Sequence, residues 1–330
     1  MNILEVQDLS VQYLVGDPNS SMNQVPLQAV ERVSFAVKHG GSLGLVGESG
    51  CGKTTIMLSL LRLLPEAGRI VGGKVVFNGR DLLQLSEQEM RDIRWCEISM
   101  VFQGAMNALN PVRTIESQLV ESLKLHNVYT AGKSSHERVG ELLELVGITA
   151  KRGKQYPHQY SGGMRQRAMI AMALSCNPRI LIADEPTTAL DVMIQAQIIE
   201  LLESLQRELN LSLIVVTHDL GLVAEMCDDV LVMYGGTLAE MASSDEIFNN
   251  ACHPYTQRLL EAFPDIEEPG TALASIPGTP PRLDDLPPGC RFEPRCHVIQ
   301  GSEICAKQHP PIREIKSGHW VACHLVERWV

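Results

Sequence analysis

The segment GESGCGKTT, residues 47–55, holds glycines, a lysine and paired threonines at a spacing that suits phosphate binding. Its glycines let the backbone turn so that successive N–H groups point at phosphate oxygens, and the N-terminus of a following helix adds positive partial charge. The spacing matches G-x-x-x-x-G-K-[ST], between an apolar run that predicts a strand and an apolar pattern that predicts a helix. We therefore predict a nucleoside triphosphate site made by Gly47, Glu48, Ser49, Gly50, Cys51, Gly52, Lys53, Thr54 and Thr55.

Two acidic residues end a second predicted strand, in the segment RILIADEPTTALD (179–191). Asp184 would hold a hydrated Mg²⁺ that the Thr54 hydroxyl also ligates, while Lys53 reaches the β- and γ-phosphates. Glu185 would orient and deprotonate the attacking water. Acidic turns after strands are common, so this element alone says little. Together with residues 47–55 it predicts a nucleoside triphosphate hydrolase.

Alternating apolar and amphipathic segments predict the elements that position these residues. Short apolar runs separated by helices favour parallel strands buried on both faces, in an α/β core. Strands are expected at 41–47, 179–184 and 211–218, and helices at 54–64, 114–126, 135–147 and 192–208. In the last of these helices a stripe at helical spacing is assigned to core packing; it consists of Ile194, Ile198, Leu201 and Leu205.

Two other regions differ from the α/β core in sequence pattern and composition. The pattern between about 104 and 178 is mostly helical, which predicts a helical insertion in the α/β core. After about residue 262 the chain is rich in Pro and Gly and has no periodicity, so we expect a loop-dominated segment without an ordinary hydrophobic core. The N-terminal residues 1–15 alternate apolar and polar side chains like a first β-strand.

Composition excludes several classes of function. A net charge of −11 and few aromatic residues argue against a nucleic-acid partner. The N-terminus lacks the basic region of a signal peptide, and the apolar runs are too short to cross a bilayer, so we expect a cytosolic chain with reduced thiols. Clustered cysteines there suggest a metal site. The scattered cysteines are interpreted as incidental thiols: Cys51, Cys96, Cys176, Cys227 and Cys252.

The segment QYSGGMRQR, residues 159–167, decides between kinds of hydrolase. Its two glycines at the start of a helix would offer N–H groups to an anion. Residues 160–167 resemble the signature motif of ATP-binding-cassette (ABC) ATPases, and the resemblance extends over the whole chain. Four further residues match this family. The resemblance implies that Tyr13 stacks on adenine and that Gln103 senses Mg²⁺ and contacts the transporter. It also implies that Asp191 lies in a dimer-contact loop and that His218 contacts the γ-phosphate.

The family resemblance implies a head-to-tail dimer with ATP between the P-loop of one chain and the signature of the other. Ser161, Gly162 and Gly163 would therefore act on ATP held by a partner. The sequence departs from the commonest signature, L-S-G-G-Q, at Tyr160 and Met164. Neither replaces the serine or the glycines that would bind phosphate, so the site is not interpreted as inactive.

The segments HPYTQRLLEAFP (253–264) and IPGTPPRLDDLPPGCRFEPRC (276–296) resemble ATP-binding subunits of dipeptide/oligopeptide permeases. The resemblance implies peptide import, with nickel, glutathione or oligosaccharide as the alternative cargo. It also implies these partners: a second, non-identical ATPase, two transmembrane subunits and an extracytoplasmic binding protein, with this chain peripheral on the cytoplasmic face of the membrane. A soluble ABC ATPase of translation or DNA repair, and a GTPase-like switch, are the less favoured alternatives.

Four cysteines lie in the C-terminal segment, at Cys290, Cys296, Cys305 and Cys323. Structural zinc usually shows tight C-x₂₋₄-C pairs, and this segment has none. Thiolates on irregular loops suit a [4Fe–4S] cluster, which the resembled permease ATPases carry here. Zinc and unliganded thiols remain open, and a nearby histidine could replace a cysteine; the candidates are His297, His309, His319 and His324. A structural staple is favoured over a redox role.

The predicted architecture is therefore an ABC-type P-loop α/β core with an antiparallel β subdomain and a helical insertion, followed by a loop-rich cysteine extension. The ATPase domain is expected at 1–262, with the helical subdomain at about 104–178. The extension is expected at 263–330.

Overall fold

The computed structural model describes residues 1–16, 25–102, 104, 108–128, 134–188, 190–262, 276–299 and 302–328. The chain divides into two compact units. The helical unit comprises Met1, Lys38–Gly41 and Gln84–Val216, and the P-loop unit comprises Asn2–Val37, Ser42–Leu83 and Thr217–Val330.

Three parallel strands run through the helical unit: β6 (Ile98–Val101), β7 (Ile180–Asp184) and β8 (Ser212–Thr217). β7 lies between the other two, with Ile180 opposite Ile98 on one side and Ser212 on the other. All residues of these strands are buried, as their continuous apolar runs predicted.

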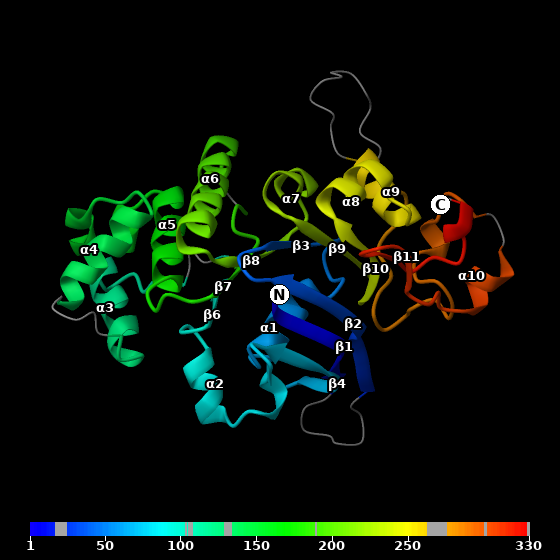
Figure 1. Cartoon of the computed structure of the whole chain (residues 1–330), viewed down its shortest axis with the longest axis horizontal. Coiled ribbons are helices and arrows are strands. Elements are labelled where there is room, and N and C mark those ends of the chain that lie inside the picture. Colours follow the sequence, from blue (N-terminus) through cyan, green and yellow to red (C-terminus); the bar gives the residue numbers. More distant parts are fainter. Residues whose placement is uncertain are drawn as a thin grey trace. The chain divides into compact units, whose positions relative to one another are not determined.

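The helices of the helical unit are α2 (Glu87–Ile93), α3 (Ile115–Leu125), α4 (Ser135–Leu145), α5 (Gly162–Ala173) and α6 (Val192–Leu209). α3, α4 and α5 pack on one another (Figure 1). Each helix begins at a side chain that accepts a backbone N–H, which satisfies one of the otherwise unpaired donors of a first turn. These caps are Ser86, Thr114, Ser134, Ser161 and Asp191.

The stripe predicted on α6 is only half right. Ile198 and Leu205 are buried as expected, but the other two buried positions are Ile199 and Leu202. Leu201 is half-buried, because the face that the neighbouring elements cover is turned by about one residue from the predicted stripe.

The P-loop unit contains two sheets. The first has the order β2 (Val25–Lys38), β1 (Asn2–Val15), β4 (Gly68–Phe77), β5 (Arg80–Asp81), and its β1–β4 and β4–β5 pairs are antiparallel. The second has the order β3 (Ser42–Val46), β9 (Asp229–Tyr234), β10 (Thr237–Ser243), β12 (His319–Val321), β11 (Arg313–Lys316). β3 and β9 are parallel, and the later pairs are antiparallel.

The helices of this unit are α1 (Lys53–Leu60), α7 (Leu220–Met226), α8 (Ser244–Asn250), α9 (Pro254–Glu261) and α10 (Glu303–Lys307). α8 and α9 both pack on β10. α1 follows β3 directly, which supplies the strand–loop–helix order predicted for residues 47–55.

The C-terminal segment takes part in the core, contrary to the prediction of a segment without an ordinary core. Phe292 is 1% exposed, and its ring centroid lies 5.1 Å from that of Tyr234 and 5.3 Å from that of Tyr255. Val321 and Val326 are buried together with Cys252 and Cys323. β12 also extends the sheet by pairing with β10. The expectation failed because the apolar residues of this segment are few and lie between Pro and Gly, so they show no periodic pattern. They nevertheless pack into a core that is built mainly by other segments.

In the part of the chain that the structure describes, no helix combines the length and the apolar character needed to cross a membrane.

Candidate nucleotide site and cysteine cluster

The loop between β3 and α1 needs its glycines for steric reasons. Gly47, Gly50 and Gly52 have φ angles of 147°, 83° and 104°, which side-chain-bearing residues rarely adopt. A Cβ on Gly47 would lie 2.3 Å from the Met233 carbonyl oxygen, whereas a Cβ on Gly50 would meet nothing within 4 Å. Gly47 therefore fits the loop against β9, and Gly50 leaves an open concave face on which an anion can lie.

Lys53 is folded into this loop. Its ammonium donates to the Gly47 carbonyl at 2.5 Å and to the Glu48 carbonyl at 3.2 Å, and the residue is 8% exposed. A buried cation held by two neutral carbonyls is poorly compensated, which favours an anionic ligand beside it. Cys51 is buried in the same loop, and burial raises the pKa of its thiol, so it is a neutral small side chain.

The second residue of the loop, Glu48, is fixed by residues far along the chain. Arg295 clamps its carboxylate with two hydrogen bonds of 2.6 and 3.0 Å, and the Tyr255 hydroxyl accepts the Glu48 N–H at 2.9 Å. Arg295 also donates to the Tyr234 hydroxyl at 3.2 Å. A planar guanidinium suits such a paired contact with a carboxylate. The loop is therefore held from the side by β9, α9 and the C-terminal segment.

A cavity of about 870 Å³ opens beside this loop. It is lined by loop residues, by the start of β2 and by the C-terminal segment 280–284. Such a volume lies within the range of small-molecule sites. Tyr13, expected beside a nucleotide base, does not line this cavity; its hydroxyl lies 3.4 Å from the Thr55 hydroxyl, at the end of β1.

The helical unit carries the acidic pair at the end of β7. Asp184 is 1% exposed, and Glu185 follows it with a φ of 50°, a conformation that strains a residue with a side chain. The Glu185 N–H donates to the Val216 carbonyl at 2.8 Å, and the Thr188 hydroxyl donates to the Glu185 carboxylate at 2.9 Å. Hydrogen bonds at the Glu185 backbone and at its carboxylate therefore fix this turn.

The predicted signature motif forms the start of α5. The Ser161 hydroxyl accepts the Met164 N–H at 3.3 Å, and Ser161 itself is exposed. Tyr160, one of the two departures from the common motif, is buried and donates to the Arg152 carbonyl at 3.0 Å. Burial raises its pKa to about 12. Tyr160 therefore fills an apolar position and leaves the exposed helix start unchanged.

Gly163 has a packing role that the motif did not indicate. A Cβ on this residue would lie 2.6 Å from Ile194 Cγ2 on α6. The glycine lets α5 and α6 approach closely, and Asp191 caps α6 by accepting the Ile194 N–H at 3.0 Å.

Two further predicted site residues remain. His218 is exposed and directly precedes the Asp219 cap of α7 in the P-loop unit. Gln103 lies outside the described residues.

The four C-terminal cysteines come into electrostatic range of one another. Burial raises the pKa of Cys290 to about 12 and that of Cys323 to about 11, and in each case other cysteines of the set add to the rise. Cys290 N–H donates to the Cys305 carbonyl at 2.7 Å. Backbone N–H groups point at three of the sulfurs, from Phe292 to Cys290, from Val298 and Ile299 to Cys296, and from Leu325 to Cys323.

Comparisons with known proteins give the relationship of the chain. Residues 30–188 match the family model described as ABC transporter, and residues 239–305 match the one described as Oligopeptide/dipeptide transporter, C-terminal region. The chain is 46% identical over 324 residues to the oligopeptide transport ATP-binding protein OppD of Salmonella typhimurium, which covers 97% of this chain and 93% of that protein. It belongs to the ABC transporter family, in the oligopeptide/dipeptide branch.

Other members of this ABC family show the same extent of similarity. The dipeptide transport ATP-binding proteins DppD of Escherichia coli and Bacillus subtilis are 44% and 45% identical and cover 98% and 99% of this chain, which spans 97% and 95% of them. Among solved structures, the dimeric cassette MJ0796 bound to ADP and Pi has a TM-score of 0.63 at 26% identity, over 73% of this chain and 98% of that one. The predicted ABC ATPase fold is confirmed.

Some residues at these sites escaped the sequence analysis. Arg295 and Tyr255 had no motif spacing that linked them to Glu48, although both lie in segments that marked the branch. Cys96 and Cys176 were interpreted as scattered thiols, yet with His126 they form a set whose ligand atoms all lie within 4.8 Å of one another. The only signal was residue type, because their 80-residue separation in sequence hides their proximity.

Proposed function

We propose that this chain is the ATP-hydrolysing subunit that drives an ABC importer for dipeptides and oligopeptides. One observation carries the proposal: the phosphate-binding loop is clamped by Arg295, a residue of the C-terminal region that marks the peptide-transporter branch. Named relatives over nearly the whole chain transport oligopeptides or dipeptides. Nickel, glutathione or oligosaccharide is the alternative cargo.

ATP binding starts from the geometry of Lys53. An arriving triphosphate would exchange the two carbonyl partners of the Lys53 ammonium for β- and γ-phosphate oxygens, while the open face at Gly50 receives the phosphates on backbone N–H groups. Thr54, Asp184 and Gln103 would hold Mg²⁺, which neutralises the charge that develops on the phosphates. Tyr13 would stack on the base.

Hydrolysis is assigned to Glu185 and His218. Glu185 lies at a strained turn directly after the buried Asp184, and we assign it the role of the base that orients and deprotonates the attacking water. His218 would contact the γ-phosphate. Ser161, Gly162 and Gly163 at the start of α5, where Ser161 is exposed, would bind the phosphate of ATP held by a partner, and Asp191 would contact that partner.

The proposed assembly contains a second, non-identical ATPase, two transmembrane subunits and an extracytoplasmic binding protein, with no nucleic acid. The proposed location is peripheral, at the cytoplasmic face of the membrane. Residues 1–262 would form the ATPase domain, with a helical subdomain at about 104–178 that contacts the permease. Residues 263–330 would form the extension.

For the extension we propose a [4Fe–4S] cluster bound by Cys290, Cys296, Cys305 and Cys323. Backbone N–H groups directed at sulfur are a means of stabilising thiolate ligands. No three of these sulfurs fall among the described sets of ligand atoms that lie within 4.8 Å of one another, a spacing that tetrahedral zinc needs. A four-iron cluster is larger than one ion and allows wider spacing. Its proposed role is a structural staple.

The test of the motor function is Glu185→Gln. ATPase activity of the assembled transporter should fall about 100-fold or more, because general-base catalysis contributes about 10²–10⁴-fold. ATP binding should persist, and the variant should form an ATP-dependent dimer seen by light scattering. Glu208→Gln, on the exposed end of α6, is the matched control and should keep normal turnover. Normal hydrolysis in Glu185→Gln would refute the assigned base.

Cargo is tested by peptide uptake into vesicles that contain the complete transporter. We expect ATP-dependent accumulation of labelled di- or oligopeptide. Accumulation of nickel, glutathione or an oligosaccharide in place of peptide would move the chain to a related branch.

A further inference from the structure

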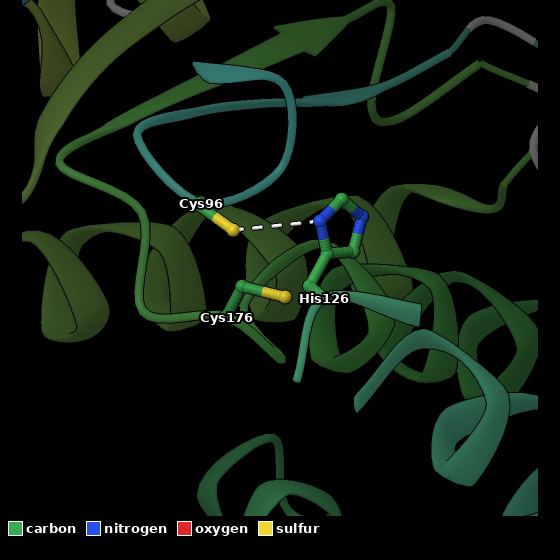
Figure 2. Close-up of side chains that lie close together, drawn as sticks. All are labelled: Cys96, His126 and Cys176. Atoms are coloured by element: carbon green, nitrogen blue, oxygen red, sulfur yellow. Dashed lines mark hydrogen bonds between the residues drawn. The ribbon is translucent and has the colours of Figure 1, made fainter. Parts of the chain in front are cut away.

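We propose that Cys96, His126 and Cys176 form a zinc-binding site in the helical unit. The three ligand atoms lie within 4.8 Å of one another, and Figure 2 shows the two sulfurs and the His126 ring directed into one space. Neither the nucleotide site nor the C-terminal cysteines use these residues. Two sulfurs and an imidazole are a donor set that favours Zn²⁺ over Mg²⁺ or Ca²⁺.

One ligand distance already equals that of a zinc centre. Cys96 Sγ lies 3.5 Å from His126 Nδ1. With Zn–S of about 2.3 Å and Zn–N of about 2.0 Å, tetrahedral bonding places sulfur and nitrogen about 3.5 Å apart. Cys176 Sγ lies within 4.8 Å of both atoms, so it would complete a set of three ligands, with the fourth position left for water. Cys96 and His126 are only partly buried, so an ion and a water can reach them.

Three different segments bring the ligands together. Cys96 lies in the turn before β6, His126 caps the C-terminus of α3, and Cys176 lies just after α5. The segments are tied by hydrogen bonds beside the ligands. The Trp95 indole N–H donates to the Met172 carbonyl at 2.7 Å, and the Ser122 hydroxyl donates to the Ser175 hydroxyl at 3.0 Å.

The turn that carries Cys96 is also strained. Trp95 has a φ of 71°, in the left-handed region that a bulky residue rarely adopts. Its backbone N–H donates to the Ile98 carbonyl at 2.8 Å, and its ring centroid lies 5.6 Å from that of the His126 ring, so the turn that carries Cys96 is fixed beside His126. Strained residues of this kind concentrate at functional sites.

Charges of both signs surround the site, because Asp92 and Glu97 lie near Cys96 and the Arg138 guanidinium lies near Cys176. The carboxylates of Asp92 and Glu97 lie near Cys96 and contribute to raising the pKa of its thiol, after burial, which is the larger cause. Burial raises the pKa of Cys176 to about 12 and lowers that of His126, so without an ion the site holds two neutral thiols and a neutral imidazole. Zn²⁺ binding would release two protons, and the two thiolates would balance the charge of the ion.

Residue-resolved alkylation tests the site in the full chain. Chelator-treated protein is reacted anaerobically with iodoacetamide, with and without Zn²⁺ in excess over all of its thiols, so that the C-terminal cysteines cannot remove the ion from Cys96, and Cys96 modification is followed by peptide mass spectrometry. We expect Zn²⁺ to slow modification of Cys96 at least about 10-fold, because a metal-bound thiolate is shielded. Equal rates with and without the ion would overturn the proposal.

His126→Gln supplies the ligand deletion, because His126 is partly exposed and its loss should leave the fold intact by circular dichroism. Zn²⁺ protection of Cys96 should disappear, with affinity in competition against a chromophoric chelator lowered about 100-fold. His136→Gln, an exposed histidine of the same unit, is the matched control and should keep the protection. Protection that survives in His126→Gln, or a Cys96–Cys176 disulfide in the untreated protein, would also overturn the zinc assignment.

Discussion

At the scale of single residues, the nucleotide loop depends on side chains that lie outside its motif. Glu48 is bound by Arg295 and Tyr255, and its own motif position tolerates any residue. A carboxylate beside a phosphate site would repel the ligand unless a cation neutralised it. The Arg295 guanidinium, whose side chain is 6% exposed, provides that neutralisation. The motif therefore identifies the residues that contact phosphate. The C-terminal segment supplies the positive charge that offsets the Glu48 carboxylate beside them.

Arg295→Met should consequently weaken ATP binding, because it leaves the Glu48 charge uncompensated next to the phosphates. We expect a rise in the dissociation constant of about 10-fold or more, measured by fluorescent-nucleotide titration. The double variant with Glu48→Gln should recover most of the affinity, with a coupling energy of about 0.5–3 kcal/mol between the two sites. Arg313→Met, which breaks the exposed pair with Glu327 away from the cavity beside the loop, is the control for loss of a surface arginine. Additive effects of Arg295→Met and Glu48→Gln would contradict this account.

His253 gives the chain a pH dependence that can be assigned to one side chain. It is buried, and its Nδ1 accepts the Tyr255 N–H at 3.0 Å, which requires the neutral imidazole. Desolvation lowers its pKa to about 4. Below about pH 6.5 the unfolded chain therefore takes up a proton that the folded chain does not.

Stability should accordingly fall as the pH drops from about 6.5 toward about 4. Between pH 7.5 and pH 5.5 this histidine should account for a loss of about 1 kcal/mol in the free energy of unfolding. Urea unfolding of His253→Asn should lack that part of the slope, since asparagine keeps the helix-capping acceptor without the titration. His158→Asn, an exposed histidine in the helical unit, should retain it. An unchanged slope in His253→Asn would remove His253 as the cause.

At the scale of elements, sequence patterns predicted the strands and helices of the cassette well, because each is a continuous segment with its own period. The strands at 179–184 and 211–218 and the helices at 114–126 and 135–147 correspond to β7, β8, α3 and α4. The prediction of which side chains of a helix are buried was less successful, because burial depends on the direction from which neighbouring elements pack. On α6, Ile199 and Leu202 are buried in place of two predicted positions. A single sequence carries no such direction.

The same limit applies to the sites. The glycine loop and the acidic end of β7 are local in sequence, so they were predictable from residue types and spacing. Arg295 on Glu48, and His126 between two cysteines, are pairings across long separations that only the folded chain brings together.

Gly163 offers a test of packing between elements. In Gly163→Ala the new methyl would meet Ile194 Cγ2, and overpacking costs about 1–3 kcal/mol, more than the helix propensity of up to about 1 kcal/mol that alanine brings. The melting temperature should drop. Adding Ile194→Ala removes Cγ2 and should restore most of the stability. If stability returns and ATPase activity does not, Gly163 also serves the phosphate of the partner's ATP; if neither variant changes stability, the close approach of α5 and α6 is not tight.

At the scale of the whole molecule, the P-loop unit contains both the first strand of the chain and the C-terminal segment. β1 begins at Asn2 and the C-terminal segment ends the unit, so the phosphate-binding loop and the cysteine extension belong to the same compact unit. Phe292, packed on Tyr234 and Tyr255, links the extension to the residues that hold Glu48. A change in the structure of the extension should therefore alter the phosphate-binding loop and its affinity for ATP.

Removal of iron tests that link. If a cluster staples the extension, chelator-treated protein should lose ATP affinity several-fold and should be cleaved first by protease in the segment around 290–323, because local opening starts where the staple is lost. Reconstitution with iron and sulfide under anaerobic conditions should restore both properties. Iron-free protein with normal ATP affinity and an uncut extension would rule out a staple.

The Arg295–Glu48 clamp joins residues 247 positions apart, which has a consequence for the order of events during synthesis. A chain leaves the ribosome from its N-terminus, so the glycine loop emerges long before the arginine that completes it. Contacts of such long separation form late in folding. The nascent cassette should therefore bind ATP only weakly until Arg295 has been translated and has left the ribosome. Tight ATP binding is expected only after that point.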